Sequence, residues 1–458
     1  HRALQTNTTA INNTAVGLCA MALNTTGAKN VAVGAGALER NTTGAENVAV
    51  GRDAMLLNTT GGGNTAVGLS ALDSNTTADN NSAFGNGVLA ANTTGTSNTG
   101  VGKNALEANT TANNNTAVGK NALGANTTGA SNVAVGQEAL SASTTAGNNT
   151  AIGRVAGSKT TTGCQNVAIG TFAHCVNTTG DNNIAIGVCS LCSNTTADNN
   201  TSVGFRAMLD NTTGASNTGI GRDALGNNTT AACNTAVGYQ SLGSNTTGAQ
   251  NTAVGVEALK ENTTGYSNVA IGFCALDTNT TGNRSVAVGE GALEKQTTGT
   301  INTGIGNRAL CNLTTGDNNI GIGVDAGTDA VGNLVTTNNF IIIGNNSHTN
   351  AKIKIDWTVT SDLRDKTNFE DIPHGLDFVN KLKPVKFNFK KSREDDTPHG
   401  NARYGFKAQD ILALEGDNPI IIDNTDTEHL GYTAGNMLPV LVNAIQELKK
   451  EIDLLKNK

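Results

Sequence analysis

The sequence predicts a mainly β fold: a long β-solenoid shaft of stacked coils, followed by a small α/β domain that ends in a helix. Three observations support this prediction. A seventeen-residue motif occurs nineteen times, with a glycine at every multiple of seventeen from Gly17 to Gly323. The residue just before each register glycine is aliphatic or aromatic, the one before that is Ala, Gly or Ser, and the period is lost after residue 327. Because the period is held without insertion, each copy is expected to form one coil that stacks on the next.

The chemistry of one copy, residues 41–57, fits a β-coil. Val48, Ala49 and Val50 are expected to form a strand in which one side chain points inward and the next outward, and a small residue next to a branched one suits a narrow interior. The register glycine, Gly51 here, indicates a backbone position with positive φ or a close approach of another chain segment. Proline is absent before residue 373, as expected if nearly every backbone N–H is a ladder donor. At about 4.8 Å per coil, nineteen coils predict a rod of roughly 90 Å.

Polar residues occupy fixed slots of the coil. The position four before the register glycine is asparagine in every copy except at Ser285. An Asn-Thr-Thr run, complete in fifteen copies, has the chemistry of a turn, and stacked asparagines can hydrogen-bond along a ladder. The run is also a glycosylation sequon, which we expect to be incidental unless the chain comes from a eukaryotic secretory pathway.

The first residues match slots inside a coil. Arg2, Ala3 and Leu4 correspond to the second, third and fourth positions after a register glycine. We therefore expect the chain to be the C-terminal piece of a longer fibre.

The amino-acid composition and net charge argue against several classes of function. Only 3% of the 458 residues are aromatic and 15% are charged, against a usual charged share of about 25%. A single coil buries too little to fold alone, so stacking and side-by-side association of chains must stabilise it. The net charge of −7 argues against nucleic acid as a partner. No apolar run is long enough to span a membrane, and no cofactor is predicted.

The eight cysteines do not form a dedicated site. Cys175 and Cys192 lie in the same slot of adjacent coils, where a disulfide is sterically possible, and Cys189 makes a Cys-x-x-Cys with Cys192. Other copies fill these slots with unlike residues, so packing of small side chains is the preferred interpretation and no metal site is predicted. His174 stands where leucine is usual and is interpreted as a tolerated substitution.

Three regions are predicted. Residues 1–327 form the shaft, 328–360 a transition segment with strands at 340–344 and 352–357, and 361–458 a separate domain whose last part, 437–458, is a helix. Apolar residues in that helix follow a heptad pattern, which predicts a coiled-coil seam that packs against partner helices. The alternative is that the helix is amphipathic and packs this face against its own domain. The seam residues are Leu438, Leu441, Ile445, Leu448, Ile452 and Leu455.

The coil motif, Asn-(Thr/Val)-Ala-(Val/Ile)-Gly-x-x-Ala-Leu, resembles the head repeats of trimeric autotransporter adhesins. That resemblance implies left-handed β-rolls that associate in threes. The period differs, because the familiar repeats are usually shorter than seventeen residues.

The C-terminal hundred residues contain several separated sequence blocks, at residues 361–368, 375–379, 382–387, 404–410 and 432–448. The order of these blocks resembles the self-cleaving intramolecular chaperone domain of phage tailspikes, endosialidases and tail fibres. A similar domain occurs in membrane-tethered transcription factors of animals, but no DNA-binding module precedes it here.

The resemblance implies a Ser–Lys pair. Ser361 would be the nucleophile directly after a scissile bond between Thr360 and Ser361, with Lys366 as its base, while Asp362 and Arg364 match the rest of the motif. A lysine can take the serine proton only if burial or nearby cations lower its pKa. The alternative is that Ser361 and Asp362 simply cap a short helix.

The patterns predict a structural and adhesive fibre, and the two resemblances imply that it is a homotrimer. The preferred interpretation is a phage tail fibre that binds a glycan or protein receptor on the host cell. The C-terminal domain would register the three shafts and act once as a serine autoprotease. The fibre would be located on a virion or at a cell surface. Two alternative functions remain, a cellular surface adhesin and an ice- or glycan-binding solenoid. A depolymerase is less favoured, because no carboxylate pair or histidine recurs in the coils.

Overall fold

The computed structural model describes residues 2–329, 332–349, 361–390, 393, 395–425, 427 and 430–457. The chain divides into two units. The first comprises His1–Ile320 with Val335–Phe340, and the second comprises Gly321–Leu334 with Ile341–Lys458.

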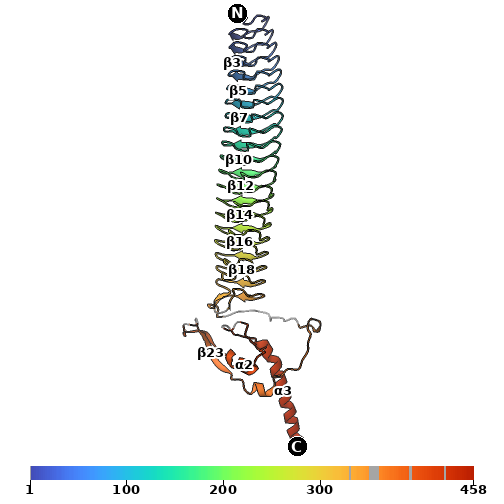
Figure 1. Ribbon diagram of the computed structural model, residues 1–458, viewed down its shortest axis with the longest axis vertical. Helices are drawn as coiled ribbons and strands as arrows, with labels where there is room; N and C mark the ends of the chain where they lie inside the picture. The colour runs from blue at the N-terminus through green and yellow to red at the C-terminus, as the bar shows by residue number, and fades with distance from the viewer. Residues whose placement is uncertain are drawn as a thin grey trace. The chain divides into compact units, whose positions relative to one another are not determined.

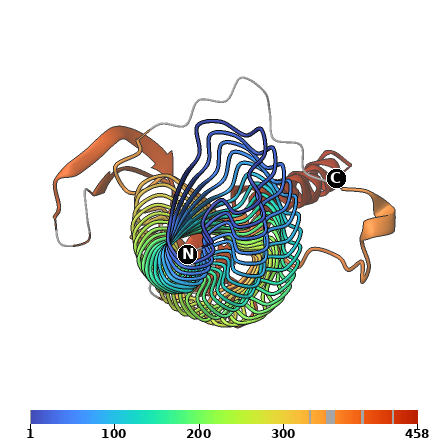
Figure 2. The ribbon, with the colours of Figure 1, turned by 90° about the horizontal axis from the view of Figure 1, so that it is seen from above.

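The first unit is the predicted β-solenoid, with one three-residue strand in each coil (Figure 1). Neighbouring strands pair in parallel at an offset of seventeen residues, so that Val31 lies beside Val48 and Ala32 beside Ala49. Viewed along the stack, successive coils overlie one another with a small rotation between them (Figure 2). The strands are β1 (Thr14–Val16), β2 (Val31–Val33), β3 (Val48–Val50), β4 (Thr65–Val67), β5 (Ser82–Phe84), β6 (Thr99–Val101), β7 (Thr116–Val118), β8 (Val133–Val135), β9 (Thr150–Ile152), β10 (Val167–Ile169), β11 (Ile184–Ile186), β12 (Thr201–Val203), β13 (Thr218–Ile220), β14 (Thr235–Val237), β15 (Thr252–Val254), β16 (Val269–Ile271), β17 (Val286–Val288), β18 (Thr303–Ile305) and β19 (Ile320–Ile322).

The narrow interior explains the residues of the motif. In β3 the side chain of Ala49 is fully buried, whereas Val48 and Val50 are only partly covered, which confirms the predicted alternation. Ala54 and Met55, in the slots usually held by alanine and leucine, fill the rest of the interior. Small and medium apolar side chains suffice because the coil is thin, and this is why the shaft needs so few aromatic residues.

Both reasons given for the register glycine hold. The register glycines have φ between 117° and 142°. A Cβ on Gly34 would lie 2.3 Å from the carbonyl oxygen of Gly51 in the next coil. Any larger residue would therefore be strained and would also collide with the neighbouring backbone.

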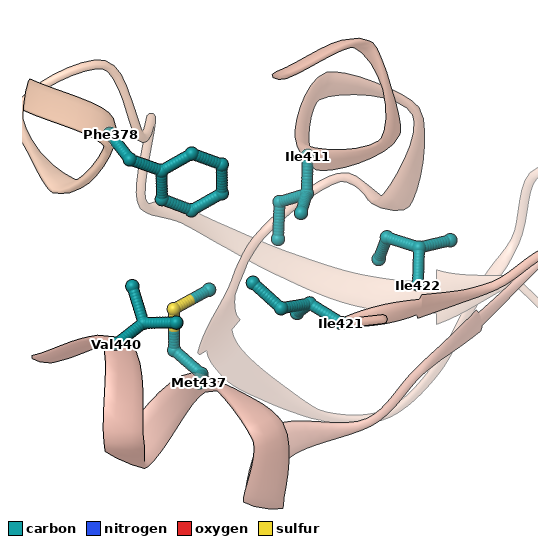
Figure 3. Packing of buried hydrophobic residues seen from close by; sticks show 6 residues of the cluster. All are labelled: Phe378, Ile411, Ile421, Ile422, Met437 and Val440. Atoms are coloured by element: carbon teal, nitrogen blue, oxygen red, sulfur yellow. The ribbon is translucent and has the colours of Figure 1, made fainter. Parts of the chain in front are cut away.

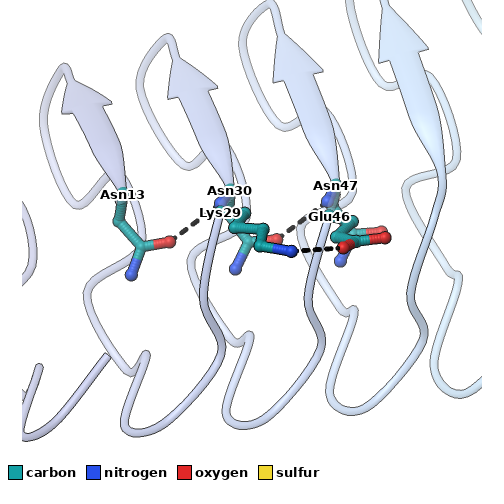
Figure 4. Close-up of polar contacts among 5 residues, drawn as sticks. All are labelled: Asn13, Lys29, Asn30, Glu46 and Asn47. Atoms are coloured by element: carbon teal, nitrogen blue, oxygen red, sulfur yellow. Dashed lines mark hydrogen bonds and ion pairs between the residues drawn. The ribbon is translucent and has the colours of Figure 1, made fainter. Parts of the chain in front are cut away.

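Two buried columns of asparagine join the coils. In one column, Asn41 Nδ2 donates to Asn24 Oδ1 at 2.7 Å and to the Gly44 carbonyl at 2.9 Å. In the other, the Asn47 backbone N–H donates to Asn30 Oδ1 at 2.9 Å (Figure 4). Asn41 belongs to a sequon, but its side chain is fully buried and its amide is engaged, so a folded coil does not offer it for glycosylation.

The coil pattern continues beyond the expected end of the shaft. Thr314 N donates to the Val335 carbonyl at 2.7 Å and Ile320 N to the Phe340 carbonyl at 2.8 Å. Thr314 and Val335 lie in adjacent coils, yet they are separated by twenty-one residues instead of seventeen. The difference arises because a hairpin of β20 (Thr328–Asp329) and β21 (Gly332–Asn333) is inserted. The segment after residue 327 thus loses the seventeen-residue period, while its backbone still pairs with the preceding coil. The predicted strand near residues 340–344 is β22 (Ile341–Ile343), while the one at 352–357 lies outside the described residues.

The second unit contains a small α/β domain. Its elements are η1 (Leu363–Asp365), α1 (Leu376–Val379), β23 (Val385–Lys390), β24 (Pro398–Gly405), α2 (Ala408–Glu415), β25 (Ile422–Asp423), β26 (Gly431–Tyr432) and α3 (Ala434–Lys456). Strands β23 and β24 pair antiparallel, as do β25 and β26. Helix α3 begins three residues earlier than the 437–458 predicted for it.

Helices α1, α2 and α3 and strand β25 meet in one apolar core (Figure 3). Its buried members are Phe378, Ile411, Ile421, Ile422, Met437 and Val440. Among the described residues, no helix is both long and apolar enough to cross a lipid bilayer.

Two carboxylates brace this domain. Glu415, the last residue of α2, accepts the backbone N–H groups of Ile420, Ile421 and Ile422 at 2.8, 2.7 and 3.0 Å. Glu447 of α3 accepts the Leu376 N–H at 2.6 Å, at the first residue of α1. Neither role could be predicted from the sequence, because both partners are backbone groups that carry no sequence signal.

Candidate functional site

The predicted Ser–Lys pair is in contact. Lys366 Nζ donates a hydrogen bond to Ser361 Oγ over 2.5 Å. The two residues flank η1, the 3-10 turn formed by Leu363–Asp365, and this turn folds the chain back so that side chains five positions apart meet. Thr360, the other side of the predicted scissile bond, lies outside the described residues.

Asp362 and Arg364 hold this turn. Asp362 Oδ1 accepts the Arg364 backbone N–H at 2.8 Å, which makes Asp362 the N-cap of η1. The Arg364 guanidinium returns to the same carboxylate, with Nε 3.0 Å from Oδ1 and Nη2 2.6 Å from Oδ2. These contacts hold the pKa of the Asp362 carboxyl below its usual value and raise the pKa of Arg364. The capping alternative is thus correct for Asp362, and it coexists with the contact between Ser361 and Lys366.

The pair is open to solvent in a single chain. Ser361 and Lys366 are both exposed. In the hydrogen bond between them the lysine is the donor. For the lysine to accept the serine proton, its surroundings must first become less favourable to the charged form.

Helix α3 carries two separate apolar faces. Met437, Val440 and Ala444 are buried in the domain's own core. The predicted seam faces elsewhere and stays 38–70% exposed: Leu438, Leu441, Ile445, Leu448, Ile452 and Leu455. The alternative in which these residues cover their own domain is therefore wrong. The seam is available for partner helices.

A second apolar surface runs along the solenoid. The residue just before each register glycine ends a strand and points outward, and in twelve coils its side chain is 36–58% exposed. These residues are Val16, Val33, Phe84, Val101, Val118, Ile152, Ile186, Ile220, Val254, Ile271, Ile305 and Ile322. An apolar stripe of this length is typical of a surface that another protein covers.

The sulfur and histidine positions show no metal site. All eight cysteines are free thiols, although Cys175 Sγ lies 2.7 Å from Cys192 Sγ of the next coil. His174 is fully buried, and burial lowers its pKa to about 3. Across the described residues, no group of three or more His, Cys, Asp and Glu side chains could hold a metal ion.

Comparison with protein families gives one match. The family model described as "Chaperone of endosialidase" matches residues 361–418. It begins at Ser361, the nucleophile that the sequence predicts. No match was found among curated proteins or solved structures. The chain therefore carries an endosialidase-type chaperone domain C-terminal to a long β-solenoid shaft.

Proposed function

We propose that this protein is a homotrimeric attachment fibre, of the phage tail-fibre type, whose C-terminal chaperone domain aligns three shafts and then cuts itself off between Thr360 and Ser361. One observation carries the proposal. Ser361, the first residue of the family match, lies in contact with Lys366. Chaperone domains of this family act in trimeric fibres, which supports the assembly part of the proposal.

The proposed cut is an intramolecular acyl transfer followed by hydrolysis. Ser361 Oγ attacks the carbonyl carbon of Thr360 while Lys366 takes the hydroxyl proton. The peptide C–N bond breaks, an ester forms, and the Ser361 amine leaves with a proton. Water then hydrolyses the ester, so the overall reaction consumes one water molecule and needs no cofactor. Asp362 and Arg364 act as positioning residues that hold the turn on which both side chains stand.

Assembly is proposed to switch this chemistry on. In a single chain Lys366 is exposed to solvent. If three domains associate around the α3 seam, the surroundings of Lys366 become more crowded and less solvated. Cleavage would then report that the trimer has formed.

The repetitive shaft explains why such a device is needed. Each coil presents nearly the same strand and the same exposed aliphatic residue, so two shafts shifted by one coil would pair almost as well as two in register. A domain that trimerises at one end sets chain number and register before the shafts associate. Its removal afterwards would leave the shaft trimer kinetically trapped.

The cleavage prediction is direct. Wild-type protein should release a fragment of residues 361–458, whereas Ser361→Ala and Lys366→Met should remain full length, because each removes one partner of the 2.5 Å contact. The matched control is Thr367→Ala, which removes an exposed hydroxyl next to Lys366 without touching the pair. Denaturing gels and intact mass spectrometry give the readout. A Ser361→Ala protein that still releases the fragment would exclude Ser361 as the nucleophile.

One observation favours a second candidate, an ice- or glycan-binding solenoid. The second threonine of the Thr-Thr pair is present in all nineteen copies and is exposed in each, as at Thr26, Thr43 and Thr60. The first threonine has a structural reason, because Thr42 Oγ1 donates to the Thr59 carbonyl at 3.0 Å. Ice binding predicts thermal hysteresis from the intact fibre, and its absence would leave attachment as the preferred function.

A further inference from the structure

The shaft carries a hollowed polar surface that no periodic feature of the sequence indicates. A groove of about 320 Å³ opens across the coils that contain β12 to β15. Its floor contains Gly226 and Gly243, which stand five residues after their register glycines. The same slot holds Leu209 in the coil before them and Lys260 in the coil after them. The groove exists because two consecutive coils lack a side chain at a slot that is filled on either side.

The groove is lined by cations on a chain that is acidic overall. Arg206, Arg222 and Lys260 line it, with Asp223 as the one carboxylate among the lining residues. Asp223 lies 3.1 Å from the Arg222 guanidinium and 3.7 Å from that of Arg206, so one carboxylate is shared by two arginines. Glu257 is 3.5 Å from Lys260. Asp277 and Glu261 also interact with Lys260, so the positive charge of the groove is concentrated on Arg206 and Arg222, on a chain whose net charge is −7.

One of these cations is held in place. The Arg222 guanidinium lies 5.7 Å from the ring centre of Phe205 and 5.7 Å from that of Tyr239, which come from the coils on either side. Cation–π contact with two rings restricts the arginine while leaving it 63% exposed. Gln240, Asn227 and Ser244 add an array of uncharged donors and acceptors along the same groove.

We propose that this groove binds a carboxylate-bearing saccharide, such as a uronate- or sialate-containing glycan. Arg222 and Arg206 would take the carboxylate, since guanidinium matches it in a bidentate geometry. The amide and hydroxyl groups of Asn227, Gln240 and Ser244 suit sugar hydroxyls. The inference rests on the proposed attachment function and assigns that function to one place on the shaft. It does not depend on the self-cleavage chemistry.

The chain supplies a matched pair of substitutions. Gly226→Leu fills the groove with the residue that the same slot already carries in Leu56 and Leu209, so the fold should accept it. Gly124→Leu makes the same change in the same slot of a coil outside the groove. The space at the two glycines is alike: an added Cβ would lie 3.2 Å from the Asp223 carbonyl oxygen in one and 3.3 Å from the Asn121 carbonyl oxygen in the other. Arg222→Gln is a third variant, chosen because Gln137 occupies the equivalent position of another coil.

The experiment measures binding of the intact fibre to an array of uronate- and sialate-bearing oligosaccharides with their neutral counterparts. Wild type and Gly124→Leu should bind the carboxylated members preferentially. Arg222→Gln should bind at least about tenfold more weakly, the loss expected for a charge-assisted hydrogen bond, and Gly226→Leu should bind at least as weakly because its side chain occupies the groove. The proposal is overturned if wild type binds no carboxylated saccharide, or if all four proteins bind alike.

Adhesion of the same proteins to a panel of bacterial strains separates this proposal from the proposed function. Adhesion by wild type that Gly226→Leu leaves unchanged would overturn the groove and keep attachment. Adhesion by none of the proteins would count against attachment itself. Reduced adhesion by Gly226→Leu alone, with Gly124→Leu unaffected, would support both.

Discussion

At the residue scale, the solenoid places leucine where glycine or asparagine would be expected. Leu38, Leu72 and Leu106 have φ of 50–54°, in the left-handed region, and so do their equivalents in most coils. This conformation costs about 1–2 kcal/mol for a residue with a Cβ. Full burial of a leucine side chain contributes about 1.5–3 kcal/mol, which is enough to offset it. The sequence predicts positive φ only at the register glycines, because local propensity assigns this region to glycine and does not register burial that depends on the neighbouring coils.

His174 gives a test of burial at the same slot. It takes the place of leucine in one coil; Asn194 Nδ2 lies 3.2 Å from its Nε2, and its Nδ1 has no hydrogen-bond partner. Burial lowers its folded-state pKa to about 3 from an ordinary 6.5. Below pH 6.5 the unfolded chain therefore binds a proton that the folded chain excludes. The stability gained by keeping this histidine neutral is present above pH 6.5 and is lost as pH falls towards 3.

The corresponding prediction is that His174→Leu removes part of the acid sensitivity of the shaft. At pH 4.5 the protonation of the unfolded state should cost wild type about 2–3 kcal/mol that the variant does not lose. Unfolding in urea at pH 7.5 and 4.5 gives the measurement. All other titrating groups are common to the two proteins, so the difference between them isolates His174. An equal pH dependence in both would contradict the buried, neutral assignment.

At the scale of elements, the regular parts of the fold could be predicted from the sequence and the irregular parts could not. Period and alternation were enough to predict the nineteen strands and the alternation of side chains within each, as at Val48, Ala49 and Val50. The inserted hairpin before β22 was missed because four additional residues break the period without ending the ladder. The seam of α3 could be predicted because it repeats, but the burial of Ala444 beside it depends on where α1 and α2 lie.

Glu415, at the end of α2, has a structural role that could not be predicted from the sequence. Its carboxylate accepts three consecutive backbone N–H groups, those of Ile420, Ile421 and Ile422, where the chain leaves α2 for β25. Glu415→Gln turns one acceptor oxygen into a donor that faces these N–H groups. We expect a loss of about 1.5–3 kcal/mol, the usual contribution of a hydrogen bond to a charged group.

Hydrogen exchange followed by mass spectrometry locates the effect of that substitution. Amides of residues 420–422 should exchange faster in Glu415→Gln, while those of the solenoid coils should be unchanged. Asp417→Asn, which neutralises an exposed carboxylate in the same loop, is the control and should leave exchange as in wild type. Equal protection in Glu415→Gln and Asp417→Asn would show that the carboxylate does not hold the loop.

At the scale of the whole molecule, two apolar surfaces have different specificity. The stripe on the shaft repeats every seventeen residues and carries no register information, because Val101 and Val118 are interchangeable neighbours. The seam on α3 occurs once per chain, so in the proposed trimer the three helices would meet there in one alignment. The sequence alone could indicate this difference between the two surfaces, because it shows that the shaft motif repeats and the α3 seam does not. Which side chains reach Ser361 and Lys366 after assembly depends on contacts between chains, and these leave no periodic signal.

Substitution in the seam tests the coupling between assembly and cleavage. Ile445 is 66% exposed in the single chain, so Ile445→Asp leaves the domain core of Met437, Val440 and Ala444 untouched. In a trimer the same change would bring three carboxylates together in one apolar layer, which is strongly unfavourable. Light scattering should therefore find monomers, and gels should show that fragment 361–458 is no longer released.

Gln446→Asp is the matched control for that substitution. It adds the same charge at the adjacent, exposed position of α3 and should leave both the trimer and the cleavage intact. Trimers in Ile445→Asp would refute the seam as the assembly surface. Monomers that still cleave would show instead that Lys366 becomes a base without assembly, so that the 2.5 Å contact within one chain is sufficient. The two measurements together therefore distinguish a chaperone that senses its own trimer from one that cuts regardless of it.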